Sequence, residues 1–144
     1  MYQKMLVPLD GSKTAECVLP QARKLAQGGL VGEIILINVV EIPPEWVFEG
    51  FDFVALKNTQ FNTAQDYLGR IEESFVAEGI QTRSVILEGK IAEAIVGFAR
   101  DNQIDLIAMA TQGRTGLKHV MFGSVALRIL HDAHTPILLI RPDY

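Results

Sequence analysis

Residues 106–124 read LIAMATQGRTGLKHVMFGS, and this stretch decides the class of fold that the sequence predicts. It opens on a short apolar run, Leu106–Ala110, which is typical of a buried parallel strand. A loop with glycines at Gly113 and Gly116 follows, and Gly123-Ser124 then precedes apolar residues at helical spacing over 125–133. A strand, a glycine-bearing loop and a helix in this order favour an α/β protein.

The same alternation of strands and helices extends on both sides of this stretch. Apolar runs predict further strands over 5–7, 34–40, 80–87 and 137–140. Three- and four-residue spacing predicts helices over 14–26, from Ala64 up to Gly79, and over 91–102. Pro20 should kink the first of them, because a mid-helix proline loses a hydrogen bond.

Five parallel strands joined by right-handed crossovers predict one α/β domain over residues 1–144. The simplest doubly wound sheet has the strand order 3-2-1-4-5, with helices on both faces. The winding direction then reverses between strands 1 and 4, and ligands of open α/β sheets bind at the carboxyl ends of the strands that flank such a reversal. The loops Pro8–Ser12 and Ala110–Ser124 should therefore form the pocket.

Composition excludes several other classes of protein. The 144 residues are 49% hydrophobic and 21% charged, with a formal net charge of −4, so a globular protein without affinity for nucleic acid or anionic membranes is expected. One cysteine, Cys17, excludes a disulfide framework. No apolar run approaches the roughly 18 residues of a membrane span, and no signal peptide is recognisable, so a cytoplasmic protein is expected.

The residues of the predicted pocket leave two interpretations open. A helix that begins at Gly123-Ser124 presents free N–H groups to an anion, but Gly113 and Gly116 could also only shape a turn, with Ser124 only a helix cap. Asp10 could bind a ligand or cap the first helix. The sequence has neither a P-loop nor a G-x-G-x-x-G motif in this region.

Three segments together resemble the universal stress protein family over essentially the whole chain. They are Lys4–Ser12 with Thr14-Ala15-Glu16, residues 109–116 with 123–126, and Pro136–Pro142. The nucleotide-binding branch of that family has a glycine, two residues, a second glycine, nine residues and then Gly-Ser or Gly-Thr. Gly113 and Gly123-Ser124 match this spacing, whereas Ala110 stands at the first glycine and Gln112 where histidine is frequent.

The resemblance implies a Rossmann-like module that binds ATP or AMP, with Mg or Mn as its accompanying ion if there is one, in a stress-response regulatory or sensor role. Asp10 would bind the ribose, the backbone of Val39 the adenine, and the framework of Gly113, Gly123, Ser124 and Val125 the phosphates, with Arg114 adding charge nearby. Pro8, Leu9, Met109, Ala110 and Thr111 would line the pocket.

At most a slow ATPase is expected, because no residue is evidently placed as a general base. The alternative is a nucleotide-free dimeric interaction module of the same fold, which Ala110 favours.

The last strand predicts a homodimer. Its residues Ile137, Leu138, Leu139 and Ile140 are all apolar, and the proposed order places them at the edge of the sheet, four residues before the last residue, Tyr144. A second copy could pair antiparallel along this strand, as the family resemblance also implies.

One segment has no clear period. Residues Glu41–Lys57 contain Pro43-Pro44 and four aromatic residues between Glu45 and Phe53, and they are long for a loop in a compact domain. The aromatic residues could form a lid or a partner surface, but packing on the edge of the sheet is the favoured interpretation.

Overall fold

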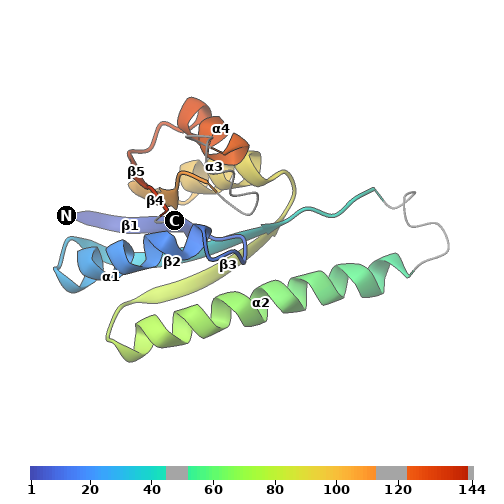
Figure 1. The fold of residues 1–144 in the computed structure, drawn as a ribbon, viewed down its shortest axis with the longest axis horizontal. Coiled ribbons are helices and arrows are strands. Elements are labelled where there is room, and N and C mark those ends of the chain that lie inside the picture. The colour runs from blue at the N-terminus through green and yellow to red at the C-terminus, as the bar shows by residue number, and fades with distance from the viewer. Residues whose placement is uncertain (45–51, 113–122, 143–144) are drawn as a thin grey trace.

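In a computed structural model, which describes residues 1–44, 52–112 and 123–142, the chain forms a parallel sheet between two layers of helices (Figure 1). The strands are β1 (Tyr2–Pro8), β2 (Val31–Val40), β3 (Thr82–Glu88), β4 (Leu106–Ala110) and β5 (Ile137–Ile140). Their order is β3-β2-β1-β4-β5 and every pair is parallel, so the predicted doubly wound sheet is confirmed.

The strands at the centre of the sheet are buried on both sides, because each face carries its own pair of helices. Successive residues of β1 and β2 point alternately into two apolar clusters. The cluster on one face includes residues of α1 (Leu19–Gln27) and α2 (Phe53–Ala77). The cluster on the other includes residues of α3 (Ile91–Asp101) and α4 (Ser124–Asp132), so the predicted helices on both faces are confirmed.

Proline placement corrects the predicted first helix. A short 3₁₀ helix, η1 (Ala15–Val18), comes first, and α1 begins immediately afterwards at Leu19. Pro20 therefore lies in the first turn of α1, where the missing N–H costs no intrahelical bond, and does not kink a continuous helix.

The predicted loop Glu41–Lys57 is also too long, because α2 begins at Phe53. Asp52 is its N-cap, and its side chain accepts a hydrogen bond from the Ala55 amide at 3.0 Å. Trp46, Phe48 and Phe51 lie outside the described residues, so the interpretation that the aromatic residues pack on the sheet edge stays a prediction.

One carboxylate fixes β4 beside β1. Asp105 accepts hydrogen bonds from the backbone amides of Gln3 and Lys4, both at 2.8 Å, just before the register in which Met5 lies opposite Leu106. Partial burial alone would raise the pKa of Asp105, but these backbone hydrogen bonds outweigh it and hold the pKa below its usual value. The charged form of Asp105 therefore stabilises the native state.

We expect Asp105→Asn to lower the free energy of unfolding at pH 7 by about 1 kcal/mol, since hydrogen bonds to a charged group are lost. A carboxyl whose pKa is depressed in the native state contributes stability above its unfolded pKa of about 3.9, and this contribution disappears as pH falls. Urea unfolding from pH 7 to pH 3 should therefore show a shallower acid loss in the variant. The exposed Asp101→Asn is the control, and equal acid dependence of Asp105→Asn and wild type would contradict the assignment.

Candidate functional site

A cavity of about 240 Å³ lies at the reversal of the winding direction, where β1 and β4 end side by side. Six elements supply its walls: the exit of β1, η1, the end of β2, α3, the exit of β4, and the first turn of α4. Its described lining residues are Pro8, Leu9, Asp10, Ala15, Ile37, Val39, Ile91, Ile95, Met109, Ala110, Gln112, Gly123, Ser124, Val125 and Ala126.

The structure brings most of the predicted site residues to this one cavity, which we call the inner cavity. Nine of them line it: Pro8, Leu9, Asp10, Val39, Met109, Ala110, Gly123, Ser124 and Val125. Thr111 is buried and takes part through its carbonyl, which accepts a hydrogen bond from the Gly123 amide at 2.7 Å. Gly113 and Arg114 lie outside the described residues, so their predicted roles stay predictions.

The loop that carries Asp10 is a tight turn with its own hydrogen bonds. Asp10 Oδ1 accepts from the amide of Ser12 at 2.9 Å and also from its hydroxyl, and the Ser12 Oγ accepts from the Ala15 amide at 3.1 Å. Gly11 has φ of +88°, a conformation that glycine adopts at little cost. Ser12 is thus the residue that caps the first amide of η1, while Asp10 holds Ser12 and lines the cavity.

Asn38 is a structural contributor that the sequence analysis missed. Its Nδ2 donates to the Leu9 carbonyl at 2.9 Å, and the Leu9 amide donates to the Ile37 carbonyl at the same distance. These two bonds hold the end of β1 against β2 and so fix the position of Leu9, the residue before Asp10. The signal was present, since Asn38 is the one polar residue in the run Ile34–Val40.

The first turn of α4 points its amides at the same cavity. Gly123 occupies the N-cap position with φ of −72° and ψ of 163° and makes no side-chain cap bond, and Ser124 is the first helical residue. The positive end of the helix dipole and the amides of the first turn therefore lie beside Asp10 and an otherwise largely apolar wall. Such a site suits a ligand with an anionic end and an apolar or aromatic body.

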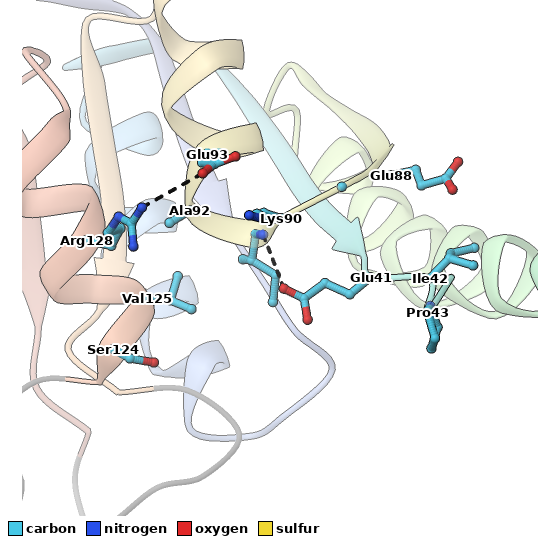
Figure 2. A pocket seen from close by; sticks show the side chains of 12 residues that line it. Glu41, Ile42, Pro43, Glu88, Lys90, Ala92, Glu93, Ser124, Val125 and Arg128 are labelled. Carbon is cyan, nitrogen blue, oxygen red and sulfur yellow. Dashed lines mark hydrogen bonds and ion pairs between the residues drawn. The ribbon is translucent and has the colours of Figure 1, made fainter. Parts of the chain in front are cut away.

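A wider groove of about 780 Å³ adjoins the inner cavity and shares Ile91, Ser124 and Val125 with it. Figure 2 shows its charged rim: Glu41 Oε1 accepts from the Ile91 amide at 3.4 Å, and Arg128 lies 3.8 Å from Glu93. Glu88 pairs with Lys57 of α2 at 2.9 Å. Acidic and basic side chains thus alternate around this groove, whereas the inner cavity is lined mainly by apolar residues.

Fold and site together define an open, doubly wound α/β protein with a small-ligand cavity at its switch point. The chain belongs to the universal stress protein family, whose model matches residues 1–141. It is 30% identical over 145 residues to the universal stress protein MJ0531 of Methanocaldococcus jannaschii, covering 98% of this chain and 83% of that protein. Among the described residues, no helix combines the length and the apolar character that crossing a membrane requires.

Solved structures agree with this assignment. The protein MJ0577, also a universal stress protein of M. jannaschii, superimposes with a TM-score of 0.86 at 28% identity, covering 100% of this chain and 99% of that one. A universal stress family protein of Arabidopsis thaliana with AMP bound superimposes with a TM-score of 0.70 at 16% identity, covering 98% and 92% of the two chains. The latter identity is low, so this second likeness shows the fold alone.

Proposed function

We propose that this chain binds an adenine nucleotide, ATP or AMP, in the inner cavity and acts as a nucleotide-dependent regulatory module. The observation that carries the proposal is the meeting of the α4 N-terminus with Asp10 at one apolar cavity on the switch point of the sheet. The AMP-bound relative from A. thaliana and a further universal stress protein structure in complex with cAMP support an adenine nucleotide as the ligand class.

Each part of the cavity is suited to one part of the nucleotide. The amides of the first turn of α4, at Ser124 and Val125, would bind phosphate oxygens, and Gly113 and Arg114 are expected beside them. Asp10 would accept hydrogen bonds from ribose hydroxyls, and the backbone of Val39 would meet the adenine. Pro8, Leu9, Met109 and Ala110 form apolar wall, and Thr111 holds the N-cap of α4 in place.

The cavity favours binding over turnover. Among the described residues that line it, Asp10 is the one carboxylate, and the proposal uses it on the ribose and not on an attacking water. Phosphate binding by helix amides stabilises the ground state and the transition state alike, so hydrolysis of ATP, where it occurs, should be slow. A bound nucleotide would therefore remain unhydrolysed, and the occupancy of the cavity would follow the concentration of that nucleotide.

A second candidate function rests on Ala110. Its methyl group stands in the wall of the cavity at the end of β4, where the related nucleotide-binding pattern has glycine, and the side chain is 6% exposed. If the methyl group prevents the approach of a phosphate, the same fold would serve as a nucleotide-free dimeric module. Both candidates share the proposed dimer, so nucleotide binding itself distinguishes them.

The free edge of the sheet supports a homodimer in both cases. Among the described residues, β5 pairs with β4 alone, and all four of its apolar residues are half-buried. The Pro136 carbonyl accepts from Ile107 of β4, and the Ile140 carbonyl accepts from Thr111, which follows β4. Because alternate residues of a strand face opposite sides, the amides of Ile137 and Leu139 point away from β4. An antiparallel copy of β5 would satisfy these groups.

The first test is the nucleotide content of the purified protein. We expect adenine nucleotide to be released when the protein is denatured, or, if purification strips it, ATP or AMP to bind the empty protein in calorimetric titration. The nucleotide-free candidate predicts neither, so absence of both signals at millimolar nucleotide would overturn the proposal in its favour.

Gly123→Val should abolish nucleotide binding, because a branched side chain at the α4 N-cap would occupy the space beside the phosphate-binding amides. The backbone angles at Gly123 suit any residue, so the variant should remain folded. Gly69→Val, at a helical position where an added Cβ meets nothing within 4 Å, is the matched control and should bind nucleotide like wild type. Unchanged affinity of Gly123→Val for ATP would place the ligand elsewhere.

Leu139→Pro should convert the dimer to a folded monomer, because it removes an edge amide that does not serve the β4 ladder. Sedimentation equilibrium at micromolar concentration should give the mass of one chain, 15.9 kDa, for the variant and about twice that for wild type. Ser84→Pro is the control: the Gln81 carbonyl accepts from β2, so by the same alternation the Ser84 amide faces the opposite free edge. A monomeric wild type or a dimeric Leu139→Pro would exclude this edge as the interface.

A further inference from the structure

We propose that Tyr67, which lies on α2 outside the inner cavity, is a positioning residue that sets the ribose affinity of Asp10. The inference rests on the proposed function, because it assigns Asp10 to the ribose. It adds a contact from the opposite helix layer: the Tyr67 hydroxyl binds Glu16, which follows the Ser12 turn, and so holds the loop that carries Asp10 at the cavity wall.

The contacts of the Tyr67 hydroxyl carry this inference. It donates to Glu16 Oε2 at 2.8 Å, across 51 residues of sequence. Glu16 lies in η1 next to Ala15, which lines the inner cavity. The Glu16 amide in turn donates to the Ser12 carbonyl at 3.3 Å, so the phenol is bonded to the residue that closes the turn after Asp10.

The remaining anchors of the loop lie on its other side. Asn38 and Ile37 of β2 hold Leu9, at the start of the loop. Asp10, Ser12 and Ala15 bond to one another within it. Tyr67 supplies the contact from α2, at Glu16, beyond the positive φ of Gly11. Since glycine gives the chain the most freedom in this turn, a contact that fixes Glu16 limits the direction in which Asp10 leaves the turn.

The environment of Tyr67 keeps its phenol protonated, as a donor to Glu16 must be. Its ring packs against the apolar cluster that includes residues of α1 and α2. Burial, then the hydrogen bond and charge of Glu16, and then the charge of Asp10 raise the pKa of Tyr67 well above its usual value, while the Gly11 backbone acts weakly in the opposite direction.

The test compares ATP with 2′,3′-dideoxyATP, which keeps the base and the phosphates but lacks the ribose hydroxyls. Wild type should bind ATP about tenfold more tightly than the dideoxy analogue, as expected for a hydrogen bond to a carboxylate. In Tyr67→Phe, calorimetry should show ATP weakened by about fivefold or more while the dideoxy affinity stays within about twofold. In an Asp10→Ala background, Tyr67→Phe should have no further effect on ATP.

Three further variants separate positioning from general loss of structure. Glu16→Ala removes the acceptor without touching the aromatic ring and should repeat the effect of Tyr67→Phe, whereas Glu16→Gln keeps an acceptor and should restore the preference for ATP. Thr63→Val deletes another α2 hydroxyl, which bonds to the Thr59 carbonyl at 2.9 Å within the helix, and should change neither affinity. Thermal unfolding confirms that each variant is folded.

The outcomes distinguish the two levels of the proposal. If Tyr67→Phe and Glu16→Ala weaken both nucleotides by the same factor, or weaken neither, Tyr67 has no positioning role and the inference is wrong although nucleotide binding stands. If wild type binds ATP and the analogue equally, Asp10 does not hold the ribose and the inference is again wrong. If wild type binds neither, the proposed function itself fails, and the inference falls with it.

Discussion

The site exists because β1 lies between two neighbours whose connections run to opposite faces of the sheet. β1 pairs with β2 on one side and β4 on the other, and the chain leaves β1 toward α1 but leaves β4 toward α4, on the other face. Right-handed crossovers permit no other course for parallel strands in this order. The two exits must therefore diverge, and the inner cavity lies between them. Burial of β1 on both faces, with Met5, Leu6 and Val7 fully inaccessible, fixes this divergence.

The residues that line the cavity would contribute unequally to recognition of the proposed ligand. Aliphatic side chains such as Ile37, Ile95 and Met109 offer contact area to a flat ring but little discrimination. Direction comes from Asp10 at one side and the α4 amides at the other, both in an environment of low polarity where a hydrogen bond is electrostatically stronger than in water. The wider groove differs, since Glu41 already occupies the N-terminus of α3 and Arg128 already faces Glu93. The first turn of α4 has no side-chain cap bond, which favours the inner cavity for the proposed anionic ligand.

Sequence reasoning recovered the strands because buried parallel strands have a strong pattern. The bounds of β4 and β5 were predicted to the residue, and the two clusters follow from alternation along β1 and β2. It missed the start of α2, because the first turns of that helix are largely exposed and carry no clear period, so that the cap at Asp52 was the only local signal. Nine predicted site residues share one cavity because strand exits converge in this topology. Asn38 could have been singled out as the one polar residue in the run Ile34–Val40, but not its partner 29 residues away. The contact of Tyr67 was missed, since neither spacing nor composition reports a bond made across 51 residues.

The position of Tyr67 makes the site depend on both layers of the fold. The first turn of α4 lies on one face, whereas the loop that carries Asp10 is bonded through Glu16 to Tyr67 of α2 on the other. The proposed ligand, bridging Asp10 and the α4 amides, would therefore connect elements of the two helix layers. A ligand that binds the native state stabilises the elements that it connects. Occupancy of the cavity by the ligand should therefore stabilise the packing of α2 as well as the cavity itself.

The same sheet ends at β5, whose free edge is the proposed dimer contact. β4 joins this edge to the cavity wall through Met109 and Ala110. The proposed nucleotide site and the proposed dimer contact thus share one strand, which is the physical basis on which such a module could pass the state of its ligand to a partner.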